Sequence, residues 1–127
     1  MENNSEIIPD SCVWLAYFSE ADAFHGIARD FFSKDDPFVV VPEYILLEVS
    51  TILRQRKLEN ELVSFLDIAT KDGVYLSAEG AGVKLAEKYK HSPYKKLSFT
   101  DFALLELSKT HRVLTYDRAL KKAIDDY

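Results

Sequence analysis

The sequence is poor in the residues that build disulfide frameworks and zinc sites. Cys12 is the one cysteine among 127 residues, so an internal disulfide is excluded, and such cysteine usage is typical of the reducing cytoplasm. The three histidines, His25, His91 and His111, are too scattered for a zinc site. We therefore expect a cytoplasmic protein without structural zinc.

Long apolar runs, repeats and low-complexity segments are also missing. No apolar stretch approaches the roughly 20 residues that span a bilayer, so we expect no membrane partner. Residues 1–6 are too acidic for a signal peptide. No linker divides the chain, and 47% hydrophobic residues suffice for a buried core. A single domain, 1–127, is the expectation.

Short apolar runs alternate along the chain with longer amphipathic segments. The predicted strands are 6–9, 38–41, 74–77 and 112–116. The predicted helices are 12–18, 22–33, 42–57, 60–71, 78–89, 99–110 and 118–126, with turns at 35–37 and 72–73. This alternation predicts an α/β domain with a central parallel sheet, in which ligands gather beyond the carboxyl ends of the strands.

Four acidic residues stand where a carboxylate is a poor choice for folding alone. Asp10 and Asp117 directly follow predicted strands. Glu48 and Asp101 interrupt apolar stretches of predicted helices. Burying an unpaired carboxylate is costly, and four that converge need a cation to offset their repulsion. The pattern therefore points towards metal-dependent chemistry.

Helix capping is the competing explanation for two of these acids. Asp10 and Asp117 each precede a predicted helix, where Asp commonly caps the first turn. Glu48 and Asp101 do not fit that explanation, because each shares a helix face with mostly apolar neighbours. Local inconsistencies of this kind tend to mark functional sites. Glu43 is the rival of Glu48, but in the first turn of its helix it suits the helix dipole.

The charge balance is acidic, and its positive part is unevenly spread. A formal charge of −5 argues against sequence-independent binding of nucleic acid, but setting the four acids aside leaves −1. Basic residues gather at 54–57 and at 84–96, where five lysines stand against Glu87. Taken alone, each group is best explained as a solvated helix end.

Four segments around the acids occur in a definite order: 10–15 (DSCVWL), 42–48 (PEYILLE), 97–103 (LSFTDFA) and 113–117 (VLTYD). In order and spacing they resemble the PIN domain family, most closely its VapC-type ribonuclease toxins. The resemblance extends over about residues 7–120. Cys12 stands where many members have Asn. The family's short last strand is either lost or lies beyond Tyr127, so we expect a three-layer α/β/α fold with four to five strands.

The resemblance implies a Mg²⁺- or Mn²⁺-dependent endoribonuclease. Asp10, Asp101 and Asp117 would hold the ion, directly or through water. Glu48 would assist or bind a second ion. Hard oxygen ligands of this kind suit Mg²⁺ or Mn²⁺ and disfavour zinc.

Smaller roles follow for polar and basic residues near the motifs. Ser11 and Thr115 would orient the ligands or contact phosphate, with hydrogen bonds in local turns as the other explanation. The residues that would receive the RNA backbone are Arg54, Arg56, Lys95 and Lys96.

The resemblance also implies partners: an RNA substrate, a second copy of the chain in a homodimer, and a VapB-like antitoxin whose tail covers the acidic cleft. Two alternatives are a catalytically inactive PIN-like interaction module and a solitary PIN nuclease in RNA processing. Other acidic-pocket α/β proteins fit less well. An aspartyl phosphatase requires a second Asp where Cys12 stands, and a receiver domain requires an Asp after the third strand, where Ser77 and Ala78 follow.

Overall fold

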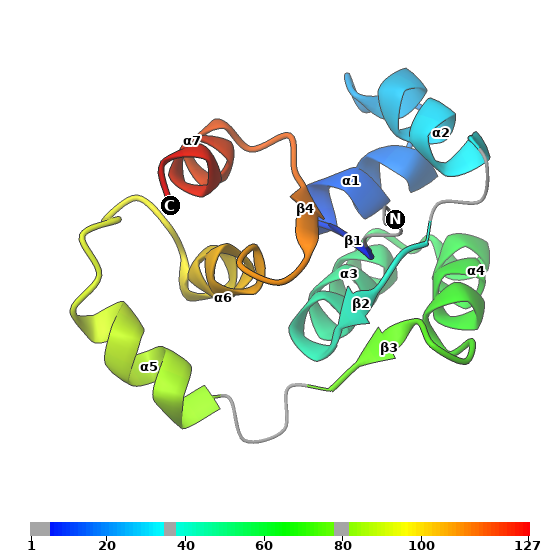
Figure 1. The fold of residues 1–127 in the computed structure, drawn as a ribbon. Helices are drawn as coiled ribbons and strands as arrows, with labels where there is room; N and C mark the ends of the chain where they lie inside the picture. The colour runs from blue at the N-terminus through cyan, green and yellow to red at the C-terminus, as the bar shows by residue number, and fades with distance from the viewer. Residues whose placement is uncertain (1–5, 35–37, 78–81) are drawn as a thin grey trace.

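Short parallel strands lie at the centre of the fold in the computed structural model, which describes residues 6–34, 38–77 and 82–127 (Figure 1). The strands are β1 (Ile7–Pro9), β2 (Val41–Pro42), β3 (Tyr75–Leu76) and β4 (Arg112–Leu114). The helices are α1 (Ser11–Phe18), α2 (His25–Ser33), α3 (Glu43–Gln55), α4 (Glu59–Ala69), α5 (Gly82–Lys90), α6 (Phe99–Leu107) and α7 (Arg118–Asp126). The predicted α/β architecture is confirmed.

The strands pair in two parallel sets that a bridge joins. β1 pairs with β4, with Ile8 opposite Val113, and β2 pairs with β3. A parallel bridge between Ile7 and Val39 links the sets, with the Ile7 amide donating to the Phe38 carbonyl at 2.9 Å. The spatial order is therefore β3-β2-β1-β4. From β1 the chain adds β2 and then β3 on one side, and it later returns to add β4 on the other side of β1. The carboxyl ends of β1 and β4 therefore border the topological switch point, where folds of this kind bind ligands.

Helices cover both faces of these strands (Figure 1). On one side α1, α3 and α4 bury Trp14, Ile45 and Phe65 completely. On the other, α6 and α7 bury Leu104 and Leu120 completely. Each such side chain stabilises the fold by about 1.5–3 kcal/mol relative to exposure. Among the described residues, no helix has the length and apolar character needed to cross a membrane.

Several predicted boundaries were wrong for local reasons. The helix predicted at 22–33 begins at His25, because the Asp22 side chain accepts a hydrogen bond from the Phe24 amide at 2.8 Å and forms a turn. The strand predicted at 38–41 is reduced to a bridge at Val39 and the pair Val41–Pro42, and Pro42 is the N-cap of α3 rather than its first residue.

The carboxyl ends of other elements also come earlier than predicted. The strand predicted to reach 116 ends at Leu114, and the helices predicted to end at 57, 71 and 110 end at Gln55, Ala69 and Leu107. At the end of α3, Lys57 adopts a φ of 62°, which an α-helix does not permit. The predicted turn at 35–37 and the start of the helix predicted at 78–89 lie outside the described residues.

Candidate active site

Asp10 lies at the carboxyl end of β1, where it is 4% exposed. Its backbone amide donates to the Leu114 carbonyl of β4 at 2.8 Å. One carboxylate oxygen, Oδ1, accepts from the Ser11 amide at 2.7 Å and caps α1. The other, Oδ2, accepts from the Thr115 hydroxyl at 2.8 Å. Asp10 is therefore both a helix cap and a side chain held towards β4.

Thr115 connects Asp10 with Asp117. While its hydroxyl donates to Asp10, its Oγ1 accepts from the Asp117 amide at 3.0 Å. Asp117 is exposed and caps α7 by accepting from the Leu120 amide at 2.9 Å. The hydrogen bonds of Thr115 thus reach across the sheet and are more than those of a local turn.

Glu48 projects from the middle of α3 towards the same region. Its Oε1 atom is buried and has no hydrogen-bond partner among the described residues. Burial raises the pKa of Glu48, a hydrogen bond from Ser11 lowers it, and the charges of Asp10 and Asp101 raise it further. Glu48 therefore lies close enough to Asp10 and Asp101 for both charges to act on it.

Asp101 lies in the first turn of α6, whose N-cap Ser98 accepts from the Asp101 amide at 3.1 Å. Burial raises the pKa of Asp101, as does the charge of Asp10. A hydrogen bond with Ser98 lowers this pKa, and Asp117 raises it. Asp101 therefore lies within electrostatic reach of Asp10 and Asp117, and Glu48 within reach of Asp10 and Asp101.

These carboxylates do not close on one point. No three His, Cys, Asp or Glu side chains within 6–34, 38–77 and 82–127 are arranged to hold a metal ion together. Their chemistry nevertheless fits Mg²⁺ or Mn²⁺, since all the donors are hard oxygens and the buried Glu48 Oε1 lacks a partner. Burial raises the pKa values of Glu48 and Asp101, and the neighbouring carboxylates raise both further, a repulsion that a bound cation would offset.

Cys12 lies beside Asp10 and Thr115 in the acidic site. Its Sγ atom lies 3.5 Å from Asp10 Oδ2 and 3.6 Å from Thr115 Oγ1, and it accepts a hydrogen bond from the Tyr116 amide at 3.4 Å. Burial, and then the charge of Asp10, raise the pKa of Cys12 to about 11, so the side chain is a neutral thiol at pH 7. A thiol is a weak donor, and it supports Asp10 less strongly than an amide at this position would.

Two of the four predicted RNA-contacting residues border a basic hollow. Lys95 and Lys96 line a cavity of about 500 Å³ together with Arg118 and Lys122 of α7. The residues predicted from the sequence did not include these two, although Arg118 directly follows Asp117 and the spacing of four places Lys122 on the same helix face. We call this cavity, lined by 93–97, 118–119, 122–123 and Asp126, the basic hollow.

The other predicted cations lie elsewhere. Arg54, in the last turn of α3, forms an exposed ion pair with Glu59 at 3.4 Å, and Arg56 is the C-cap of that helix. Neither lines the basic hollow. Glu43, the rival of Glu48, accepts a hydrogen bond from the Tyr75 hydroxyl at 2.6 Å in the first turn of α3.

Comparison with known proteins gives a family and a fold. The sequence model of the family described as PIN domain matches residues 7–125. Among solved structures, this chain is similar to VapC20 of Mycobacterium tuberculosis, described as a toxin that cleaves the sarcin–ricin loop. The TM-score is 0.76 at 21% identity, over 93% of this chain and 95% of that chain, which shows a shared fold. No curated protein sequence matches this chain.

Proposed function

The chain belongs to the PIN domain family, and from that premise we propose that it is a metal-dependent endoribonuclease, the toxin of a type II toxin–antitoxin pair. The observation that carries the proposal is that Thr115 joins Asp10 to Asp117 beside the carboxyl ends of β1 and β4, while Glu48 and Asp101 lie close enough for neighbouring carboxylates to raise their pKa values. The fold shared with a toxin that cleaves an RNA loop supports RNA as the substrate.

In this proposal the carboxylates would hold Mg²⁺ or Mn²⁺. Asp10, Asp101 and Asp117 are the proposed ligands, and Glu48 assists through Oε1, its buried oxygen without a partner. When bound, the ion would supply Lewis-acid chemistry, activating a water and offsetting charge on the phosphate oxygens. Thr115 and Ser11 keep the Asp10 carboxylate in a fixed orientation through hydrogen bonds of 2.8 and 2.7 Å.

The proposed partners follow from the same family assignment. RNA is the proposed substrate, and we propose that Lys95 and Lys96, which line the basic hollow, contact its backbone. We propose a homodimer in the cytoplasm and a VapB-like antitoxin that covers the acidic site and neutralises its charge.

Removing one proposed ligand tests the function. We expect Asp101→Asn and Asp10→Asn each to lower Mg²⁺- or Mn²⁺-dependent RNA cleavage by more than about 100-fold, because loss of an outer-shell partner alone costs 10- to 100-fold. Cleavage of structured RNAs, including a sarcin–ricin loop oligonucleotide, is measured with each metal and with EDTA. Asp67→Asn on the exposed side of α4 is the matched control.

Circular dichroism verifies that each variant is folded. Unchanged turnover in both Asp10→Asn and Asp101→Asn contradicts the metal-site assignment. No cleavage by the wild-type protein with either metal would favour a PIN domain that acts as an interaction module.

A further inference from the structure

A second hollow adjoins the acidic site, because Asp117 lines it, while the next residue, Arg118, lines the basic hollow. It has a volume of about 400 Å³, and its lining residues are Cys12, Asp22, Ala23, Phe24, Tyr116 and Asp117. The proposed chemistry uses Asp117 alone among these. The volume of this hollow suffices for a flat group such as a base, and a group bound there would lie next to Asp117.

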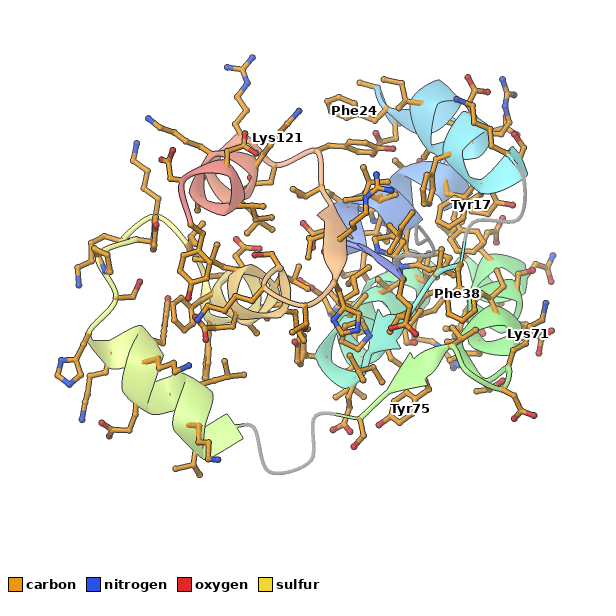
Figure 2. The ribbon with its side chains drawn as sticks, in the orientation of Figure 1. Tyr17, Phe24, Phe38, Lys71, Tyr75 and Lys121 are labelled. Carbon is orange, nitrogen blue, oxygen red and sulfur yellow. The ribbon has the colours of Figure 1, made fainter. Side chains whose placement is uncertain are left out.

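An aromatic pair, Phe24 and Tyr116, forms one side of this hollow. Their rings stack with centroids 4.8 Å apart and planes inclined by 18°. Phe24 is nevertheless 43% exposed, because Tyr116 covers one ring face and leaves much of the rest open. Figure 2 shows Phe24 beside the connection between β4 and α7.

The backbone around Phe24 is fixed although the side chain is exposed. The Phe24 amide donates to Asp22 Oδ1 at 2.8 Å. The next residue, His25, places its Nδ1 atom 2.9 Å from the Ala16 carbonyl of α1. An exposed aromatic residue costs free energy in water, and one held rigidly beside a polar site is suited to stacking on a ligand.

The aromatic pair is tied directly to the proposed metal ligands. The Tyr116 amide donates to Cys12 Sγ at 3.4 Å, and that sulfur lies 3.5 Å from Asp10 Oδ2. Asp117 is the next residue after Tyr116. A group stacked on Phe24 therefore lies beside the acids, at a position fixed by the same connection that places Asp117.

The two hollows differ in polarity, and the change comes after Asp117 along the chain. On the Tyr116 side the hollow offers aromatic rings and the carboxylate of Asp22, which repels phosphate. On the other side, Arg118 begins the basic hollow with Lys122. A single RNA strand has matching parts, because its bases are flat and uncharged and its backbone is anionic.

We propose that Phe24, backed by Tyr116, stacks against an unpaired base that flanks the scissile phosphate, while the backbone beyond it enters the basic hollow. This inference rests on the proposed function for its substrate, single-stranded or looped RNA. Stacking on an aromatic ring tolerates all four bases, so Phe24 selects an unpaired base without reading its identity.

The first test asks whether removing the Phe24 ring and removing the flanking base have the same effect on cleavage. Phe24→Leu keeps apolar cover on Tyr116 but removes the π face, and we expect kcat/KM to fall about 5- to 150-fold. An otherwise identical RNA with an abasic site at the flanking position should lose the same factor with the wild-type protein. The abasic RNA and the variant together should show no additional loss. Losses that multiply, or a variant that cleaves intact RNA normally, overturn the proposal.

A second test does not depend on turnover. Single-stranded RNA carrying the fluorescent base 2-aminopurine at successive positions is mixed with Mg²⁺ and the Asp101→Asn protein, which should not cleave it. With Phe24 present, we expect the 2-aminopurine fluorescence to be quenched at one position. Phe24→Trp should retain the quenching and Phe24→Leu should lose it. Absence of quenching at every position overturns the stacking even if RNA is cleaved. Quenching by a protein whose wild-type form cleaves no RNA supports the stacking while the proposed function fails.

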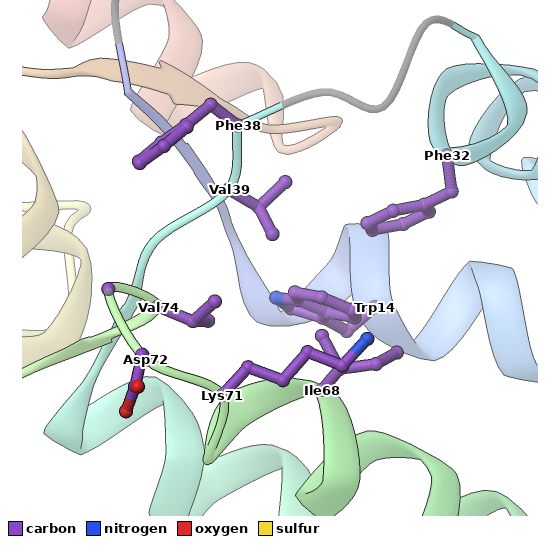
Figure 3. A pocket seen from close by; sticks show the side chains of 9 residues that line it. Trp14, Phe32, Phe38, Val39, Ile68, Lys71, Asp72 and Val74 are labelled. Atoms are coloured by element: carbon purple, nitrogen blue, oxygen red, sulfur yellow. The ribbon is translucent and has the colours of Figure 1, made fainter.

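Phe38→Leu is the matched control for both tests. Phe38 is 56% exposed and borders an apolar hollow of about 350 Å³ that it shares with Val39 and Val74 (Figure 3). Its carbonyl bonds to the first residue of β1, at the opposite end of that strand from Asp10. We expect this variant to match the wild-type protein in cleavage and in quenching.

Discussion

At the scale of single residues, Thr115 has the largest structural role relative to its size. Its one hydroxyl donates to Asp10, which directly follows β1, and accepts from the amide of Asp117, two residues further along the chain. It is 7% exposed, so water cannot replace these bonds easily. The sequence predicted that Thr115 orients a ligand or contacts phosphate, but not that its partner is Asp10, because a bond across 105 positions leaves no local pattern.

We expect Thr115→Val to lower both stability and activity. The valine has a similar shape but leaves Asp10 Oδ2 without its hydroxyl donor, which costs about 1–3 kcal/mol of unfolding free energy. Cleavage should fall about 10- to 100-fold, because Asp10 loses an outer-shell partner. Urea denaturation and kcat/KM measure the two effects.

Thr115→Ser should retain most of the unfolding free energy and of the cleavage activity, since it keeps the hydroxyl. Thr70→Val is the matched control, because the exposed Thr70 hydroxyl donates only to Leu66 of its own helix, at 2.8 Å. Wild-type cleavage by Thr115→Val would show that Asp10 needs no support from β4.

At the scale of elements, the sequence predicted which segments are helices and strands better than where they end. The helix at 118–126 has the predicted bounds, because Asp117 caps it with its own side chain. The strand before it ends two residues early, because its partner β1 ends at Pro9 opposite Leu114 and the next residue, Asp10, caps α1. Periodicity detects apolar faces, whereas contacts between distant segments decide the boundaries.

Contacts between distant segments also limited the prediction of the RNA-contacting basic residues. Local charge runs favoured Arg54 and Arg56, which lie at the end of α3, outside the basic hollow. Arg118 and Lys122 were missed, because they become neighbours of Lys95 and Lys96 only when α7 packs near residues 93–97. The acids were easier to find, since a carboxylate in an apolar helix face is visible in the sequence itself.

Substitutions in α7 should change how RNA binding depends on salt. Each phosphate contact to a single strand contributes about 0.7 to the slope of log K against log salt concentration. We expect the pair Arg118→Gln and Lys122→Gln to reduce the slope by up to about 1.4, measured on the Asp101→Asn background to prevent cleavage. Arg54→Gln and Lys71→Gln, both outside the basic hollow, should leave the slope unchanged. If Arg54→Gln alone reduced the slope, we would conclude that the RNA backbone contacts the end of α3 and not the basic hollow.

At the scale of the whole molecule, the strand order β3-β2-β1-β4 concentrates negative charge at one end of the sheet. β1 and β4 are far apart in the sequence but pair in parallel, so Asp10 and Asp117 follow neighbouring strands. Glu48 and Asp101 approach from helices on opposite faces of the sheet. This arrangement opposes folding when no cation is bound, since like charges are brought out of water together.

We therefore expect Glu48→Gln to raise the melting temperature of the protein in EDTA at pH 7. Burial, with Asp10 and Asp101 nearby, raises the pKa of Glu48 above its ordinary value of 4.5, so the folded state binds its proton more tightly than the unfolded state does. The charged form destabilises the fold above that raised pKa. As the pH falls through it towards 4.5, the wild-type protein gains stability and its difference from the variant closes.

Metal should reverse the ranking that EDTA reveals. With Mn²⁺ in excess, the wild-type protein gains stability by mass action, and Glu48→Gln gains less because it has lost an oxygen ligand. Scanning calorimetry in EDTA and in Mn²⁺, at pH 7 and near 4.5, gives all four comparisons. Glu20→Gln, on the exposed connection between α1 and α2, should follow the wild-type protein throughout. Equal melting temperatures for the wild-type protein and Glu48→Gln in EDTA would mean that the four acids do not oppose the fold, and the case for a cation among them would lose its physical basis.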